Sequence, residues 1–263
     1  MRELLAHVQF RGMIRERTVE PYLGLLKAIR EKRRIRGVLL DISSGGGADI
    51  PSTDFYLAVK RLDAVKPVVA SIGSIGASGA YMAALGARRI YAYPDSEVGS
   101  IGVVYPHLAV QKLLEKVGVE VELLHEGRHK DAYQGLRPLT DEERTKLSAV
   151  ARDSYNSFVE TVARERHRTI DEILLLATGE FWSGKRAAQL GLVDALGDRE
   201  AALQDLSTMT GVPVRKSVRV VPPRPFLERF FGGAGWSLSR GLSESLRDSL
   251  EEILLDASWR GGR

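Results

Sequence analysis

Two glycine-rich stretches, each placed after a predicted strand, could bring backbone N–H groups close to a reacting atom. The first is SSGGGAD, residues 43–49, and the second is GASGA, residues 76–80. Glycine has no side chain, so the backbone of such a stretch can approach a ligand closely. Neither stretch fits the spacing of the common phosphate-binding motifs. The pattern instead favours paired N–H groups aimed at an oxygen that becomes negatively charged during a reaction.

Ser78 is the residue of these stretches that could act as a nucleophile, because Gly76 and Gly79 flank it and a predicted helix begins there. A serine hydroxyl is a weak nucleophile and needs a base to take its proton. GASGA misses the G-x-S-x-G nucleophile pattern by one position, since a glycine directly follows the serine. No histidine has a sequence context that marks it as the base. The five histidines are His7, His107, His125, His129 and His167.

The composition is that of an ordinary globular protein, with 44% hydrophobic and 27% charged residues in a chain of 263. Cysteine is absent, which excludes disulfides, thiolate nucleophiles and cysteine metal sites and fits a reducing compartment. The net charge of +4 is a mild excess that does not support nucleic-acid binding. The densest basic run, residues 27–36, contains no aromatic residue on which bases could stack. We therefore predict no nucleic-acid partner.

The segment between Lys66 and Arg88 carries no charge and is long enough to cross a bilayer. Its glycines argue against a membrane helix, since each costs a helix about 1 kcal/mol relative to alanine. We instead predict a buried strand over residues 67–72, a turn over 73–79 and a buried helix over 80–87. The N-terminal residues lack the continuous apolar core of a signal peptide.

Predicted strands and helices alternate along most of the chain. The strands are 5–14, 35–43, 67–72, 88–94 and 119–127, and residues 98–106 continue as strand or extended loop. The helices are 19–33, 51–65, 80–87, 109–118 and 183–191. A further long helix opens near residue 140, where Thr140 and Glu143 form the T-x-x-E pattern of a capping box. This order predicts an α/β fold with a mainly parallel sheet and covering helices.

The composition changes near residue 213, where a segment rich in proline and arginine begins. We predict a main domain over residues 1–212 and a C-terminal extension over 213–263. The extension includes a predicted helix over 242–255 with an apolar stripe and an acidic face. An acidic face suits an anionic membrane surface poorly. Packing of this helix against the main domain or another subunit is therefore preferred to membrane attachment.

Four stretches of the sequence, taken together and in order, have a familiar pattern. They are LLDISSGGGAD, KPVVASIGSIGASGAYMAALGARRIYAYPDSEVGSIGVV, EGRHKDAYQGLRPLTDEER and FWSGKRAAQLGLVD. In these stretches the chain resembles the signal peptide peptidase A type of serine protease, a relative of the Clp protease and crotonase fold. The resemblance covers residues 5–197, roughly three-quarters of the chain.

The resemblance implies a Ser-Lys dyad. Ser78 matches the family's nucleophile and Lys130 its general base, while Ser100 matches the serine that orients the lysine. Gly46 and Gly79 match the residues whose N–H groups form the oxyanion hole. A lysine serves as a base near neutral pH only if its pKa falls by about three units from ~10.4, and burial away from carboxylates acts in that direction. The resemblance implies no metal and no cofactor.

Some features depart from the family pattern or leave alternatives open. The family's usual Asp-Ser-Pro-Gly-Gly corresponds to residues 42–46, so Ser44 replaces the proline that fixes the turn of the oxyanion loop. An ion pair between Lys130 and the adjacent Asp131 would keep the lysine charged and inactive. The neighbouring His129 stays a rival base. The N-terminal membrane anchor common in the family is missing from this sequence.

From this resemblance we expect a serine endopeptidase that cleaves extended hydrophobic peptides, such as remnant signal peptides or membrane-protein segments. The family implies a homo-oligomeric ring in which serine and lysine can come from neighbouring subunits. We expect a cytoplasmic location, with peripheral membrane association left open. One alternative is a crotonase-like acyl-CoA enzyme, which would need no serine nucleophile but a pair of carboxylates near its pocket. The other is a non-catalytic scaffold of the same fold that binds membrane-protein partners.

Overall fold

The computed structural model describes residues 3–222, and the compact unit that holds them ends at Val221. The strands of this unit are β1 (Leu4–Arg11), β2 (Ile35–Ser44), β3 (Val68–Ala77), β4 (Arg89–Ala92), β5 (Glu97–Gly99), β6 (Phe181–Ser183), β7 (Ala195–Leu196) and β8 (Ser217–Val220). The helices are α1 (Glu16–Glu31), α2 (Asp49–Asp63), α3 (Gly79–Leu85), α4 (Gln111–Lys116), α5 (Asp141–Arg166), α6 (Ile170–Leu174), α7 (Gly184–Gln189) and α8 (Arg199–Thr210). A short 3₁₀ helix, Val214–Lys216, precedes β8.

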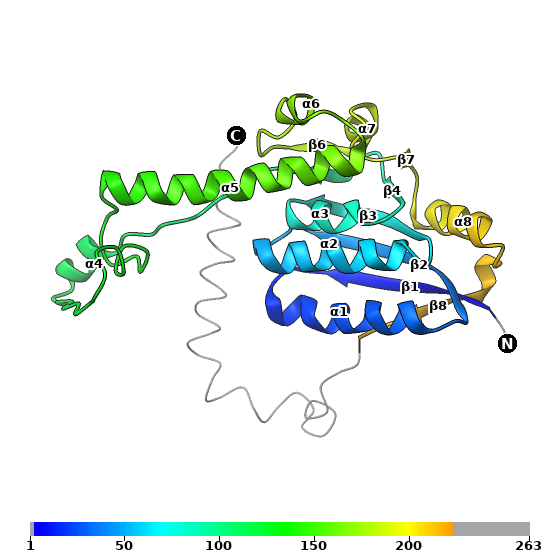
Figure 1. The fold of residues 1–263 in the computed structure, drawn as a ribbon, viewed down its shortest axis with the longest axis horizontal. Helices are drawn as coiled ribbons and strands as arrows, with labels where there is room; N and C mark the ends of the chain where they lie inside the picture. The colour runs from blue at the N-terminus through cyan, green and yellow to red at the C-terminus, as the bar shows by residue number, and fades with distance from the viewer. Residues whose placement is uncertain (1–2, 223–263) are drawn as a thin grey trace, which may run out of the picture. The chain divides into compact units, whose positions relative to one another are not determined.

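The strands form one sheet in the order β6-β5-β3-β2-β1-β8, with β4 also paired to β3 and β7 paired to β4. Within the described part of the chain, the pairing of β5 with β6 is antiparallel and the other strand pairs are parallel. The predicted α/β fold with a mainly parallel sheet is therefore confirmed. In Figure 1 the helices α1, α2 and α3 lie in front of this sheet.

Both faces of the sheet are covered, which explains the unbroken apolar run in the middle of β2. Leu40 belongs to the larger core shared with α1, α2 and α3, whereas Leu39 points to the other face. There it packs against Leu206 of α8. A parallel strand that is buried on both faces carries consecutive apolar residues rather than alternating ones. The buried strand predicted over residues 35–43 has this environment.

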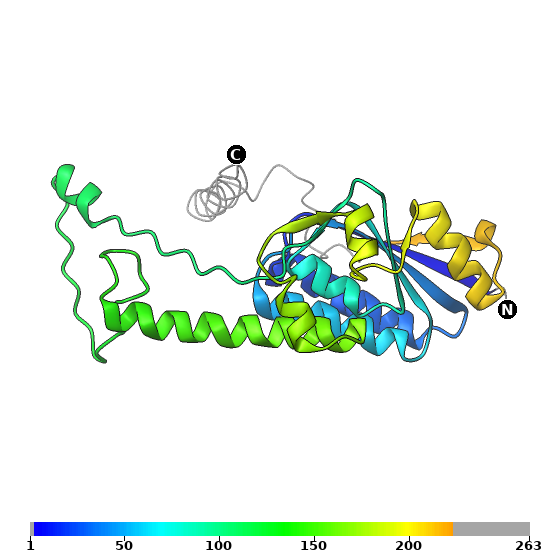
Figure 2. The ribbon, with the colours of Figure 1, turned by 90° about the horizontal axis from the view of Figure 1, so that it is seen from above.

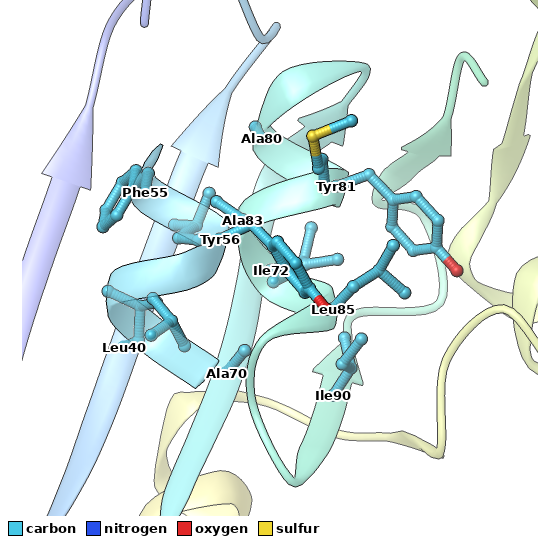
Figure 3. Close-up of a cluster of buried hydrophobic side chains, with 14 of the residues drawn as sticks. Leu40, Phe55, Tyr56, Ala70, Ile72, Ala80, Tyr81, Ala83, Leu85 and Ile90 are labelled. Carbon is cyan, nitrogen blue, oxygen red and sulfur yellow. The ribbon is translucent and has the colours of Figure 1, made fainter. Parts of the chain in front are cut away.

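Helix α3 is buried over its whole length, and its packing holds Ser78, the residue directly before it, in place. Figure 3 shows Ala83 and Leu85 clustered with Ile72 of β3 and Tyr56 of α2. A Cβ at Gly86 would lie 2.7 Å from the carbonyl oxygen of Tyr56, so only glycine permits this close approach of α2. The small residues of this helix therefore position Ser78 against a rigid layer.

Residues 103–140, which we call the arm, project from the sheet and run beside the first half of α5 (Figures 1 and 2). The 26 residues of α5 span about 39 Å at 1.5 Å per residue. Its buried residues lie in the second half, apart from Glu143 near its start. The capping box predicted at the start of α5 is confirmed, because Thr140 and Glu143 exchange hydrogen bonds of 3.3 and 2.9 Å.

Three expectations from the sequence differ from the structure. The strand predicted over 119–127 is wrong, because this part of the arm lies away from the sheet and pairs with no described strand. The turn predicted over 73–79 is largely strand, since β3 continues to Ala77 beside β5. Strand β8 pairs with β1, so the compact unit continues past the expected boundary at residue 212.

The helix predicted over residues 242–255 lies outside the described residues. Among the helices of residues 3–222, none combines the length and the apolar character that a bilayer crossing requires.

Asp41 of β2 is a buried carboxylate with several polar partners on the face of the sheet that also carries α8. Arg11 donates to Asp41 Oδ1 at 2.8 Å, and Gln9 donates to Oδ2 at 3.0 Å. His7 and Arg199 lie 3.4 Å from Oδ2. Burial alone would raise the pKa of Asp41, but the hydrogen bonds from His7, Gln9 and Arg11 outweigh it and hold that pKa well below its usual range.

We expect this cluster to make the fold acid-sensitive. Because the folded pKa of Asp41 is depressed, its stabilising contribution is present above the unfolded value of about 3.9 and is lost as the pH falls through the folded pKa. Asp41→Asn should lower the free energy of unfolding at pH 7 by about 1–3 kcal/mol. Denaturant unfolding at pH 7 and pH 3 should show the difference from wild type shrinking at pH 3. Asp153→Asn, at an exposed position on α5, is the control and should change little. An equal difference at both pH values would contradict this account.

Candidate active site

Three turns meet at the carboxyl ends of β2, β3 and β5. The ladder pairs Ser44 with Gly76, and further along it pairs Ala77 with Gly99. Parallel register then places the residues after these pairs side by side. The three turns are residues 45–47, Ser78 and Ser100. Segments that are far apart in the sequence thus form one site at the edge where parallel strands end.

Ser78 has an unusual backbone conformation for a residue with a side chain, with φ 50° and ψ −125°. Such a conformation costs on the order of 1–3 kcal/mol and persists only where the surroundings enforce it. Here the N–H of Ser78 donates to the carbonyl of Gly99 at 2.7 Å, and its carbonyl accepts from Met82 at 3.0 Å. Backbone strain of this kind on a serine between a strand and a buried helix indicates a functional residue.

The glycine loop after β2 packs directly against Ser78. A Cβ at Gly46 would lie 2.8 Å from the Cβ of Ser78 and from the nitrogen of Gly79, so position 46 admits no side chain. The N–H of Gly46 donates to Ser44 Oγ at 3.1 Å and is therefore already engaged. Gly47, with φ 155°, is exposed to the cavity beside Gly79, and its N–H makes no hydrogen bond to the described residues.

The structure distinguishes the glycines near the predicted oxyanion hole. Gly79 has its N–H at the first position of α3, where the helix supplies no acceptor. The N–H of Gly46 donates to Ser44, whereas the N–H of Gly47 beside Gly79 makes no hydrogen bond to the described residues. Adjacent glycines in SSGGGAD could not be told apart by pattern, because their contacts with Ser44 and Ile14 distinguish them.

The glycine loop is held on its outer side by the segment after β1. Ile14 donates its N–H to the carbonyl of Gly46 at 2.8 Å and accepts from the N–H of Ala48 at 2.9 Å. A Cβ at Gly47 would lie 2.0 Å from the carbonyl oxygen of Ile14. These contacts, together with the bond to Ser44, fix the loop without the proline expected at position 44.

Ser78 and Gly79 open onto a cavity of about 620 Å³. Its lining residues are Gly47, Ala48, Asp49, Ser52, Ser78, Gly79, Met82, Ser100, Gly102, Val103, Val104, Tyr105, Ser154, Tyr155, Phe158, Ala177, Thr178 and Gly179. The lining includes one carboxylate, Asp49, and neither a histidine nor a lysine. Among residues 3–222, no group of three side chains could hold a metal ion. The described chain thus offers a hydroxyl, backbone donors and one carboxylate here, but no histidine or lysine beside them.

Ser100 lines the same cavity and is the other strained serine of the site. Its φ is 48°, its N–H donates to the carbonyl of Glu180 at 2.8 Å, and its Oγ donates to that of Gly179 at 3.2 Å. The structure therefore brings together Ser78, Gly79 and Ser100 of the five predicted site residues, with Gly46 directly behind them.

Lys130 is not brought to this cavity within one chain. It is exposed on the arm, next to Asp131, whose partner Arg137 is bound to Glu143 near the start of α5. Phe158 lines the cavity and lies 15 residues after Glu143 along α5, which is about 22 Å at 1.5 Å per residue. A lysine side chain does not bridge such a separation. The ion pair with Asp131 left open by the sequence is not formed either, since Lys130 pairs with none of the described residues.

Comparisons with known proteins agree with this geometry. Residues 60–213, more than half of the chain, match Peptidase family S49. The candidate protease slr0021 of Synechocystis sp. is 35% identical over 252 residues, which is 94% of this chain and 91% of that protein. The chloroplastic serine protease SPPA of Arabidopsis thaliana is 30% identical over 90% of this chain, which spans 35% of that protein. The chain belongs to peptidase family S49 and is a serine peptidase.

Two solved structures resemble the fold. A membrane-bound stomatin-specific protease, 1510-N, aligns with a TM-score of 0.54 at 14% identity, covering 85% of this chain and 100% of that one. ClpP1 of Listeria monocytogenes aligns with a TM-score of 0.50 at 12% identity, covering 74% of this chain and 93% of that one. The expected relation to the Clp protease fold is confirmed.

We expect Ser44 to support catalysis through the glycine loop. Ser44→Ala removes the acceptor of the buried Gly46 N–H, which loosens the loop that carries the Gly47 N–H. Peptide hydrolysis should show kcat reduced by about tenfold with KM little changed, because the lost contact matters most when the oxyanion forms. Ser43→Ala, at the half-buried neighbouring position, is the control. Equal effects of the two variants, or an effect on KM alone, would contradict this role.

Proposed function

We propose that this peptidase is an endopeptidase with Ser78 as nucleophile and Lys130 of a neighbouring copy as general base. The observation that carries the proposal is that the cavity with Ser78 and the arm with Lys130 are each incomplete as a catalytic site. A strained serine lies in a cavity with free N–H donors but neither histidine nor lysine, and an unpaired lysine lies on a projecting arm. Each half supplies what the other lacks.

In the proposed mechanism, the neutral amine of Lys130 takes the proton of the Ser78 hydroxyl as Ser78 Oγ attacks the peptide carbonyl. The carbonyl oxygen becomes negatively charged and accepts hydrogen bonds from the N–H groups of Gly47 and Gly79. The lysine ammonium then protonates the leaving amine, and the C–N bond breaks. Lys130, neutral again, removes a proton from a water molecule that hydrolyses the acyl-enzyme and restores the serine.

Ser100 keeps the role that the resemblance implies for it, which is to orient the lysine amine. Its Oγ lies in the cavity shared with Ser78, and its one described acceptor is the carbonyl of Gly179. A hydroxyl has two lone pairs, so it can still accept a hydrogen bond from an incoming amine while it donates to Gly179.

The exposed apolar surface of the arm supports an oligomer, as the ring predicted from the sequence requires. Large apolar side chains on the arm are exposed to solvent at Val104, Leu108, Leu113, Val117, Val119, Val121, Leu123 and Leu124. Leu124 alone is 92% exposed. So many exposed apolar side chains on one segment support a protein–protein contact. Docking of the arm on a neighbouring copy would cover it and deliver Lys130 at the same time.

The lining of the cavity supports extended apolar peptides as substrates. Met82, Tyr155, Phe158 and Val104 offer apolar surface near Ser78, and Asp49 is the one carboxylate of the lining. We therefore propose segments such as remnant signal peptides or pieces of membrane proteins. We retain the cytoplasmic location predicted from the sequence, with access to such segments at the membrane surface.

We expect the dyad to be supplied by two copies. Ser78→Ala and Lys130→Ala should each lower peptide hydrolysis at least ~10³-fold. Co-expression of the two inactive variants in equal amounts should restore about a quarter of the wild-type activity, because a quarter of the heterologous interfaces then join an intact serine to an intact lysine. Lys116→Ala on the arm and Ser74→Ala on the sheet, both exposed, are the controls. If co-expression restores no activity although the oligomer has its wild-type size, one chain supplies both residues.

We expect Asp49 to disfavour acidic substrates. Peptides with leucine beside the cleaved bond should have a kcat/KM about tenfold higher than matched peptides with aspartate, because like charges repel in a partly desolvated cavity. Asp49→Asn should narrow this ratio without changing turnover of the leucine peptide. The comparison uses synthetic peptides at fixed ionic strength. An unchanged ratio would remove Asp49 from the account of specificity.

Covalent labelling separates this proposal from the acyl-CoA alternative. A fluorophosphonate should label wild type at Ser78, as read by mass spectrometry of the intact protein and its peptides. A crotonase-like enzyme would not label, and its expected pair of carboxylates is absent from the lining, which has Asp49 alone. A non-catalytic scaffold would neither label nor turn over peptides.

A further inference from the structure

The base of the proposed dyad lies in a segment crowded with acids. Asp131 directly follows Lys130, and the first turn of α5 adds Asp141, Glu142 and Glu143. A carboxylate within about 4–6 Å of an amine favours the charged ammonium, which cannot accept a proton. The chain must therefore keep these acids from pairing with Lys130 if this lysine is to act as a base.

Arg137 engages two of these four acids, Asp131 and Glu143. Its Nε donates to Asp131 Oδ2 at 2.8 Å. Its two terminal nitrogens donate to Glu143 at 2.9 and 2.7 Å, one to each carboxylate oxygen. Asp131 and Glu143 are both buried, at 7% and 2% exposure, so these contacts are shielded from competing solvent. A planar guanidinium can make such a double contact, whereas an ammonium such as Lys130 acts as a single point charge.

The charges of the three partners reinforce this arrangement. The hydrogen bond from Arg137 holds the pKa of Asp131 below its usual range, and the same guanidinium lowers the pKa of Glu143. The two carboxylates in turn raise the pKa of Arg137. At neutral pH the group is therefore a stable cation between two anions, and both anions have a partner other than Lys130.

Glu142 and the two histidines of this segment also have charged partners. Glu142 lies 2.6 Å from Arg128, 3.4 Å from His129 and 3.5 Å from Lys146. His129 also lies 3.6 Å from Glu143, and His125 lies 3.7 Å from Asp131 Oδ1. In the cavity that would receive the amine, Asp49 is the one carboxylate of the lining. Asp131, Glu142 and Glu143 thus each have a cation or an imidazole beside them, whereas Lys130 makes no ion pair with the described residues.

We propose that Arg137 is a positioning residue for the base: by holding Asp131 and Glu143, it leaves Lys130 free to enter the neighbouring cavity without a carboxylate of its own chain. This inference rests on the proposed function, in which Lys130 takes the proton of Ser78. Arg137 touches neither the substrate nor Ser78. Its effect is on the protonation of the amine, and its readout is therefore the pH dependence of turnover.

The test is the pH profile of kcat/KM for peptide hydrolysis by the assembled full-length protein. Arg137→Met keeps much of the aliphatic length and releases Asp131 beside Lys130. The acidic limb of the profile should move to higher pH by about one unit, since an added neighbouring carboxylate favours the ammonium. Turnover on that limb at fixed pH should fall about tenfold, and most of it should return at alkaline pH.

Removal of the released acid separates this role from a merely structural one. Arg137→Met combined with Asp131→Asn should return the acidic limb close to its wild-type position. Asp131→Asn alone should leave the limb unchanged, because Arg137 already engages that carboxylate. Loss of turnover at every pH, without rescue by Asp131→Asn, would overturn the proposal and leave Arg137 as a structural residue.

Two further variants serve as a milder substitution of Arg137 and as a matched control. Arg137→Lys keeps the charge but cannot bridge both acids, so it should move the limb in the same direction by less. It also keeps the test decisive if Arg137→Met does not assemble. Arg128→Met is the matched control, because Glu142 retains His129 and Lys146. An equal shift in Arg128→Met would overturn the specific role of Arg137.

The outcome of Lys130→Ala distinguishes the two levels of the argument. If Lys130→Ala retains full turnover, the proposed function fails. If Lys130→Ala is inactive and the limb of Arg137→Met stays in place, the inference about Arg137 fails while the proposed dyad stands.

Discussion

The site depends on the parallel pairing of β3, which joins β2 on one side and first β4, then β5, on the other. This pairing sets Ser44 opposite Gly76 and Ala77 opposite Gly99, so three turns end at one place. The strain on Ser78 is tolerable because the same ladder fixes Gly99, which accepts its N–H. Displacement of any of the three strands by one residue would separate the nucleophile from the amides beside it.

The two halves of the proposed site have different physical characters. Ser78 and its glycines lie on a close-packed layer, where α3 is buried throughout. Lys130 lies on an arm whose own packing is polar and local, centred on Arg137 and its two acids. The first half is set by the core of the fold, whereas in the proposed function the second is completed by the surface of a neighbouring copy. On that proposal, catalysis requires assembly.

Local chemistry in the sequence predicted a good part of this structure. The apolar runs of β2 and β3 predicted buried strands, and Thr140 with Glu143 predicted the start of α5. What failed depended on contacts between distant segments. The residues 119–127 have strand-like composition but no neighbouring strand, and Gly46 differs from Gly47 only through Ser44 and Ile14. The separation of Lys130 from Ser78 follows from the length of α5, whose course past the body no local pattern reveals.

Only the second half of α5 packs against the core, so its first half holds the arm away from the cavity. In the proposed function, a single folded copy keeps Lys130 away from Ser78, because the part of α5 from Glu143 to Phe158 alone spans about 22 Å. An isolated copy would therefore be inactive. Assembly depends on the concentration of the protein, so a higher concentration would favour the active assembly and dilution would favour the inactive single copy.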